Sequence, residues 1–103
     1  MKSLLILIAG PVRSGTHNRA ELIDANLNNM AQVALRVYQK GHIPVVGEWL
    51  SEEYLYPVAH RVISRCDAIL RMPGESRGAD LDIEEGKKRG LSIYYSLEEI
   101  PDR

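Results

Sequence analysis

The chain of 103 residues has no phenylalanine, a single cysteine and almost no excess of charge of either sign. A single cysteine excludes an intrachain disulfide, so we expect a protein of a reducing compartment, the cytoplasm. The 13 basic and 14 acidic side chains give a formal net charge of -1. Because the charges balance, the sequence has no excess of positive charge that would favour binding to a nucleic acid polymer or an anionic membrane. Any anionic ligand must therefore be bound by local groups.

Long hydrophobic runs are also missing. The apolar opening, Leu4 to Ala9, is far shorter than the roughly 20 residues of a membrane span, and it lacks the longer core and cleavage pattern of a signal peptide. No internal repeat, linker or low-complexity segment interrupts the chain. We therefore expect one globular domain over residues 1–103 and no membrane segment.

Strand and helix patterns alternate along the chain. The continuous apolar run from Leu4 to Ala9 is typical of a strand that is covered on both faces of a parallel sheet. Residues 19–40 carry apolar side chains every three or four positions, which predicts an amphipathic helix ended by Gly41. Asn26 lies mostly off this apolar stripe and is expected to face solvent.

The remaining elements follow from similar patterns. Asn18 followed by Glu21 predicts a capping box at the start of the first helix. Further strands are expected at 42–46, 68–70 and 92–95, further helices at 57–66 and 79–89, and a capped single turn at 96–99. This alternation predicts a three-layer, flavodoxin- or Rossmann-like α/β fold with a four-stranded parallel sheet in the order 2-1-3-4. In that order the loops after Ala9 and Leu70 flank one crevice.

These two loops contain residue types suited to binding an anion or a sugar. Their glycines permit close backbone approach, their hydroxyls and one arginine supply polar groups, and a helix begins directly after the second loop. Glycine-rich turns are also needed simply to build such a fold, so a structural role stays open. The candidate binding residues are Gly10, Arg13, Ser14, Gly15, Gly74, Ser76 and Gly78.

The acidic helix after the second loop offers a carboxylate. We expect Asp80 and Asp82 in its first turn, and a carboxylate directed along the crevice can attack an anomeric carbon to form a covalent glycosyl intermediate. The alternative for either residue is to complement the positive end of the helix dipole. The sequence does not determine which of Asp80, Asp82 and Glu84 faces the crevice.

Other reactive or aromatic residues have two interpretations each. Trp49, in a loop rich in aromatics and carboxylates, either stacks on a planar ligand or covers the core or a subunit contact. Cys66 is interpreted as a buried packing residue rather than a nucleophile. His17 and His42 are interpreted as surface or packing residues, and because the three histidines lack ligand spacing we expect no metal site.

A resemblance to a known family adds to this interpretation. Gly10-Pro11-Val12-Arg13-Ser14-Gly15 resembles the Gly-Ser-Ile-Arg-Gly-Gly loop of the 2′-deoxynucleoside 5′-phosphate N-hydrolases. Ser76-Arg77-Gly78-Ala79, with an acid four residues beyond the glycine, is similar to the nucleophile segment of the wider nucleoside 2-deoxyribosyltransferase superfamily. The resemblance to small bacterial members of that superfamily extends from Leu4 to about Tyr95.

The resemblance implies cleavage or exchange of the N-glycosidic bond of a (deoxy)nucleoside or its 5′-monophosphate, without a cofactor. By position, Gly10 and Arg13 would line the substrate site, Ser76 and Gly78 would hold the 5′-phosphate or 5′-hydroxyl, and Asp82 would be the nucleophile. The resemblance also implies a homodimer or higher homo-oligomer. Candidate interface residues are Trp49, Tyr54 and Tyr56.

The chain departs from the family pattern at two positions. Asp82 stands where the family has glutamate, and Ala59 stands where the family has an acid that handles the base. His60, beside Ala59, is our candidate for protonating the leaving base, since imidazole titrates near neutral pH. Glu48 and Glu52 are alternatives for that role.

Two other functions compete with this one. In the first, the protein is a non-catalytic nucleotide-binding module, and the departures at Asp82 and Ala59 reflect lost chemistry. In the second, it is a phosphoribohydrolase related to the lysine-decarboxylase-like proteins, as Pro73-Gly74 and the acidic helix suggest. This last alternative fits less well because the Gly-Gly-x-Gly-Thr element of those proteins is absent.

Overall fold

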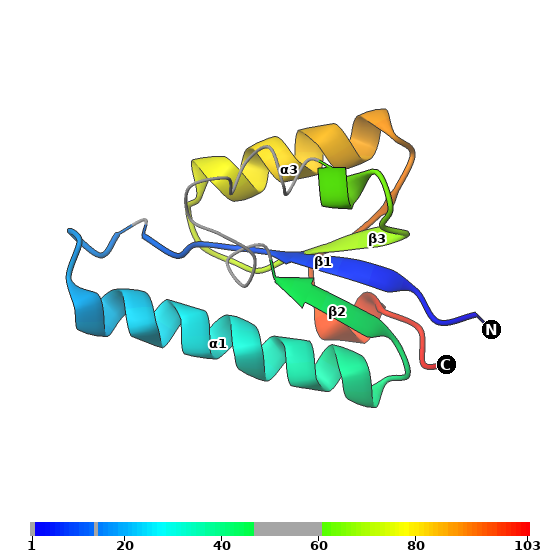
Figure 1. The fold of residues 1–103 in the computed structure, drawn as a ribbon, viewed down its shortest axis with the longest axis horizontal. Coiled ribbons are helices and arrows are strands. Elements are labelled where there is room, and N and C mark those ends of the chain that lie inside the picture. Colours follow the sequence, from blue (N-terminus) through cyan, green and yellow to red (C-terminus); the bar gives the residue numbers. More distant parts are fainter. Residues whose placement is uncertain (1, 14, 47–60) are drawn as a thin grey trace.

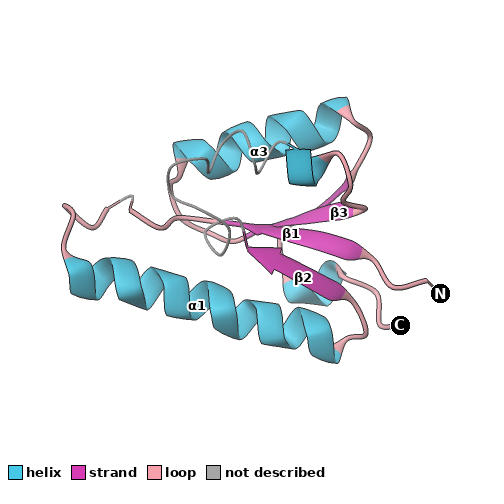
Figure 2. Ribbon diagram, in the orientation of Figure 1, coloured by secondary structure: helices cyan, strands magenta, loops and turns pink. Residues whose placement is uncertain are grey.

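A parallel β-sheet with helices on both faces forms the centre of the molecule (Figures 1 and 2). The computed structural model describes residues 2–13, 15–46 and 61–103. The strands are β1 (Leu5–Ala9), β2 (Ile43–Val46), β3 (Ala68–Arg71) and β4 (Ser92–Tyr94). The helices are α1 (Ala20–Gln39), α3 (Arg77–Lys88) and the short 3-10 helix η2 (Leu97–Glu99). The expected three-layer α/β arrangement is therefore confirmed.

The four strands lie in the order β2-β1-β3-β4 and all pairs are parallel, as the sequence predicted. β1 occupies a central position, which explains why its residues are apolar without alternation. At its end, Ala9 lies opposite Arg71 of β3. The loops that leave β1 and β3 therefore start side by side at the carboxyl edge of the sheet.

Each face of the sheet has its own hydrophobic core. α1 and η2 cover one face, where Met30, Ala34 and Val37 of α1 are buried. α3 covers the other face through buried Ala79, Ile83 and Gly86. Figure 2 shows α1 and α3 on opposite sides of the strands. Periodic apolar residues in the sequence thus define which side of each helix packs on the sheet.

The start of α1 differs from the prediction. The helix begins at Ala20, and Arg19 is its N-cap without a side-chain capping bond, so the predicted capping box is wrong. Asn18 instead has a left-handed backbone with φ of 60°, and Glu21 forms an ion pair with Arg19. A turn sets this geometry, since the Arg19 N–H donates to the Thr16 carbonyl at 3.0 Å. The predicted glycine at the other end is confirmed, because Gly41 follows the C-cap with φ of +95°.

α3 begins two residues earlier than predicted. Ser76 is its N-cap, and the Ser76 Oγ accepts a hydrogen bond from the Ala79 N–H at 3.2 Å. With this start, Asp80 lies in the first turn and Asp82 does not, which corrects the expectation that both would. The capped turn predicted at 96–99 forms as η2, but the Ser96 side chain makes no capping bond. The Tyr95 N–H donates to the Glu99 carboxylate at 3.0 Å instead.

The helix predicted at 57–66 falls largely outside the described residues. Within the described part, residues 61–63 are helical. Buried Ile63 and Cys66 of this segment belong to the same core as α3.

The amino ends of the strands are joined by two polar side chains. The buried His42 accepts a hydrogen bond from the Leu4 N–H at Nδ1 (3.0 Å) and donates from Nε2 to the Pro101 carbonyl (2.6 Å). These two bonds require the neutral tautomer with its proton on Nε2. Asp67 accepts a hydrogen bond from the Leu5 N–H at 2.8 Å. Because His42 is buried and both of its ring nitrogens bind backbone groups, its role is structural.

Candidate functional site

The loops after β1 and β3 contact each other, as predicted from the strand order. A Cβ added to Gly10 would lie 2.9 Å from the Cβ of Met72, so only glycine permits this approach without displacement. A Cβ on Gly74 would lie 3.0 Å from the Cγ of Pro11, and Gly74 has φ of +112°. The Met72 N–H also donates to the Ala9 carbonyl at 2.8 Å. The two loops are therefore held together at the carboxyl edge.

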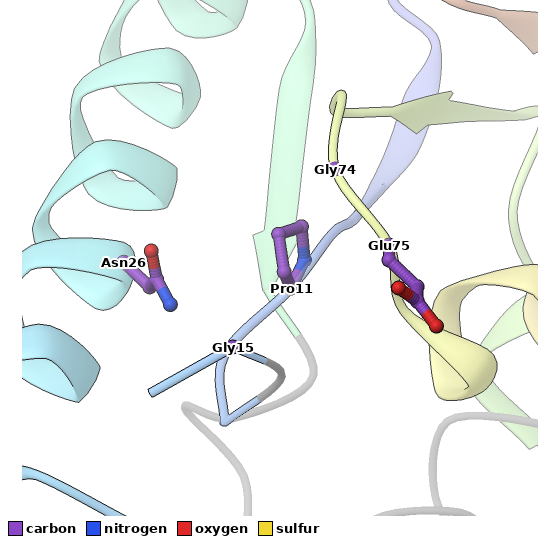
Figure 3. Close-up of a pocket in the computed structure, with 5 residues that line it drawn as sticks. All are labelled: Pro11, Gly15, Asn26, Gly74 and Glu75. Carbon is purple, nitrogen blue, oxygen red and sulfur yellow. The ribbon is translucent and has the colours of Figure 1, made fainter. Parts of the chain in front are cut away.

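A cleft of about 430 Å³ opens between these loops and the first half of α1. Figure 3 shows Pro11 lying between Asn26 on one side and the Gly74-Glu75 segment on the other. Asn26 donates from Nδ2 to the Val12 carbonyl at 2.8 Å, which fastens the first loop to α1. The described residues that line the cleft are Pro11, Gly15, Asn26, Gly74 and Glu75.

Asn26 and Glu75 were missed by sequence reasoning. Asn26 was assigned to solvent because it lies beside the apolar stripe of α1, yet it is half-buried and binds a loop carbonyl. The feature that could have identified Asn26 is an amide side chain one or two turns into the helix that follows a glycine-rich loop. Glu75 sits beside Gly74 in the second loop, but nothing in its local sequence shows that it reaches a cleft shared with the first loop.

The residues that the sequence analysis singled out, apart from Arg13 and the acids of α3, divide into three groups. Gly15 and Gly74 line the cleft, and Gly10 brings its walls together. Ser76 is 7% exposed and caps α3, while Gly78 is half-buried in the first turn of that helix. The third group lies outside the described residues: Ser14, Glu48, Trp49, Glu52, Tyr54, Tyr56, Ala59 and His60.

Arg13 forms the bend of the first loop. Its carbonyl accepts hydrogen bonds from the buried Thr16, from the backbone N–H at 3.2 Å and from Oγ1 at 2.6 Å. The Arg13 residue itself is exposed. Backbone and hydroxyl groups thus close the turn at the Arg13 carbonyl.

The three acidic residues at the start of α3 have different environments. Asp80 is exposed and forms an ion pair with Arg71, with 3.0 Å between Oδ1 and Nη2. Glu84 is exposed. Asp82 lies on the sheet-facing side with Ala79, is half-buried, and has its Oδ1 shielded from solvent. Asp82 is therefore the acid of this group that faces inward, and it is not among the described residues that line the cleft.

Arg71 is a third residue that the sequence analysis did not identify. Its side chain is 11% exposed at the end of β3, and besides the Asp80 ion pair it donates from Nη1 to the Met72 carbonyl. It thereby joins the strand end, the second loop and the first turn of α3. The feature of the sequence that could have identified it is a cation directly after three buried apolar residues.

The described residues support neither a cysteine nucleophile nor a metal site. Burial raises the pKa of the Cys66 thiol to about 11, and the negative charge of Asp67 adds to the rise, so this thiol is not activated as a nucleophile. Within residues 2–13, 15–46 and 61–103, no three His, Cys, Asp or Glu side chains are grouped so that they could hold a metal ion. In the same ranges no helix combines the length and apolar composition that crossing a membrane requires.

Comparison with known proteins adds no further assignment to this geometry. No protein-family model matches the sequence, and the search of curated proteins returned no significant match.

Proposed function

We propose that the protein cleaves or exchanges the N-glycosidic bond of a (deoxy)nucleoside or its 5′-monophosphate, as a member of the nucleoside 2-deoxyribosyltransferase superfamily. The observation that carries the proposal is the contact between the two glycine-rich loops. It creates a cleft at the carboxyl edge of a parallel sheet, where ligands of open α/β folds bind. The helix that follows the second loop carries the proposed nucleophile, Asp82, on its sheet-facing side.

The cleft suits a ligand of nucleoside size. Its volume of about 430 Å³ falls within the range of about 300–1,000 Å³ that small-molecule sites occupy. Proline and glycine backbone, one amide and one carboxylate line the described part. These groups supply hydrogen-bond partners for sugar hydroxyls and for the edges of a base.

In the proposed reaction, a carboxylate oxygen of Asp82 attacks C1′ as the bond from C1′ to the base nitrogen breaks. The bonding electrons leave with the base, whose nitrogen receives a proton from an acid, and a covalent glycosyl ester remains on Asp82. Water or a second base then attacks C1′ and releases the carboxylate, which gives net retention of configuration. We assign the proton to His60, with Glu48 and Glu52 as alternatives; all three lie outside the described residues.

The remaining parts of the proposal come from the family resemblance, except the cytoplasmic location, which comes from the single cysteine. The reaction needs no cofactor. We propose a cytoplasmic homodimer or higher homo-oligomer, with Trp49, Tyr54 and Tyr56 as candidate contacts.

The test is release of free base, measured by chromatography on a panel of nucleosides and 5′-monophosphates, with and without an added acceptor base. We expect Asp82→Asn, which keeps the shape of the side chain, to reduce release by at least about a hundredfold, because an amide cannot form the ester. Glu84→Gln is the matched control, since it removes a carboxylate from an exposed position of the same helix. Release that survives Asp82→Asn would contradict the nucleophile assignment.

A second candidate function, nucleotide binding without catalysis, is favoured by one observation. Asp82 has a shielded Oδ1 and is not among the described residues that line the cleft. On this alternative, a nucleoside or nucleotide raises the melting temperature and no substrate in the panel releases its base.

A further inference from the structure

We propose that Glu75 makes the cleft selective for ligands without a phosphate, so that the preferred ligand is the nucleoside and not its 5′-monophosphate. This inference rests on the proposed function for its ligand class. Glu75 is exposed and lines the cleft opposite Asn26 (Figure 3). It would act as a specificity-determining residue, separate from the chemistry assigned to Asp82.

The backbone on both sides of Glu75 is fixed. Gly74 packs against Pro11, at a distance that leaves no room for a side chain on Gly74 without displacement. Ser76 is 7% exposed and caps α3. Between these two anchors the backbone of Glu75 cannot move away from the cleft without breaking the loop contact or the cap. Glu75 is therefore held at the cleft wall by its backbone.

The charge of the described cleft wall is negative. Of its residues, Pro11, Gly15, Asn26 and Gly74 have no acidic or basic side chain, and Glu75 carries a carboxylate. Of the arginines near this edge, Arg71 is bound to Asp80 and Arg19 to Glu21, whereas Arg13 and Arg77 are exposed and are not among the described residues that line the cleft. A phosphate monoester carries about -1.5 to -2 charges at pH 7, so it would meet a like charge.

The start of α3 is also partly occupied as an anion site. Free N–H groups in the first turn of a helix attract phosphate. Here the Ala79 N–H donates to the Ser76 Oγ at 3.2 Å, and the Asp80 N–H donates to the Ser76 carbonyl at 3.0 Å. The cap therefore engages the Ala79 N–H, which would otherwise be available to donate to a 5′-phosphate. A carboxylate, in contrast, accepts hydrogen bonds from neutral hydroxyl and amino groups, which a nucleoside supplies.

The experiment compares deoxyadenosine, deoxyguanosine, deoxycytidine and thymidine with their 5′-monophosphates. For each pair, binding is measured by calorimetry and base release by chromatography, using the full chain, Glu75→Gln and Glu75→Lys. Glu84→Gln is the matched control, because it removes the same charge from an exposed position that does not line the cleft.

We expect the unmodified protein to bind the nucleoside more tightly than the monophosphate. Glu75→Gln should shift this ratio toward the monophosphate by about tenfold at low salt, which corresponds to about 1.4 kcal/mol. Glu75→Lys should shift it further, Glu84→Gln should leave it within about twofold, and added salt should reduce the shift because it screens exposed charges.

The two proposals fail in different ways. If both ligands bind as expected but no base is released, the glycosidic chemistry is wrong and the selectivity stands. If base is released but the monophosphate is preferred, or if Glu75→Gln leaves the ratio unchanged, the role of Glu75 is wrong and the chemistry stands. Failure of both ligands to bind contradicts both proposals.

Discussion

The two edges of the sheet are held together in different ways. At the amino edge, polar side chains bind backbone groups of distant segments, as His42 does with Leu4 and Pro101. At the carboxyl edge, two loops meet by direct backbone approach through Gly10 and Gly74. Side-chain hydrogen bonds join the segments at the amino edge, whereas a cleft opens at the carboxyl edge. The difference suggests that one edge mainly supplies stability and the other mainly supplies a binding site.

Further bonds reinforce the amino edge. Ser3 donates from Oγ to the Gly41 carbonyl at 2.6 Å, and the Arg103 N–H donates to the Lys40 carbonyl at 2.9 Å. Lys40 also pairs with Asp102 at 3.0 Å. Substitutions there should change the free energy of unfolding and leave ligand preference unchanged, and substitutions beside the cleft should change ligand binding.

The largest effect is expected for His42→Ala. This change leaves the Leu4 N–H and the Pro101 carbonyl without their partner and opens a cavity, so we expect a loss of about 2–4 kcal/mol in the free energy of unfolding. Urea denaturation gives this value. His17→Ala, at an exposed position, is the control and should change stability by less than about 0.5 kcal/mol. A loss below about 1 kcal/mol at His42 would remove the main support for a stabilising amino edge.

Gly10→Ala tests the carboxyl edge. The added methyl would lie 2.9 Å from the Cβ of Met72, so the two loops must separate, at a cost of about 1–3 kcal/mol. We expect weaker binding of the preferred ligand by calorimetry. Gly86→Ala is the matched control, because its methyl would meet the Cδ1 of Ile69 at 2.5 Å, between α3 and the sheet. Equal ligand affinity in the two variants would show that the loop contact does not form the site.

The Cys66 thiol provides a smaller, pH-dependent effect beside the amino edge. Its pKa is raised from 9.0 to about 11 by burial and by the charge of Asp67, so the unfolded chain loses this proton first as pH rises. The stabilising contribution is complete below pH 9 and is lost as pH rises toward 11. This rise in pKa corresponds to a total of about 2.7 kcal/mol, of which about 1.4 kcal/mol is lost by pH 10. Urea denaturation at pH 7.5 and pH 10 should show this loss in the native sequence and a smaller one in Cys66→Ala. An identical pH dependence in both proteins would contradict the buried, protonated thiol.

The smallest effect is expected for Asp80→Ala. Its ion pair with Arg71 is largely exposed on the aspartate side, and such pairs contribute about 0.2–1 kcal/mol. Denaturation with and without added salt measures this contribution, which salt should reduce. A loss well above about 1 kcal/mol would indicate that the pair holds the second loop in place, as the Asn26 bond to Val12 does for the first loop.

The fold could be predicted because its signals are local. The apolar run before Gly10, the periodic apolar residues of 19–40 and Gly41 each specify an element from neighbouring residues, and the rules for parallel sheets then give the strand order. The capping box at Asn18 failed because a turn closed by Thr16 positions the chain before the helix.

The candidate site could be predicted only in part. Gly15 and Gly74 were identified because glycine in a loop after a strand is itself a signal. The roles of His42, Asn26 and Glu75 depend on partners or neighbours that are distant in the sequence, such as Pro101, which lies 59 positions from His42. No local pattern encodes such pairings.

The position of the two chain ends has a practical consequence. The first described residues and the last residue lie beside the amino ends of the strands, on the side of the molecule away from the loop that leads into α1 (Figure 1). The last residue is joined to α1 through the hydrogen bond between Arg103 and Lys40. A sensor surface attached through a tag at either end would therefore hold the protein with its cleft turned toward the solution, an orientation suited to measuring the binding of small ligands.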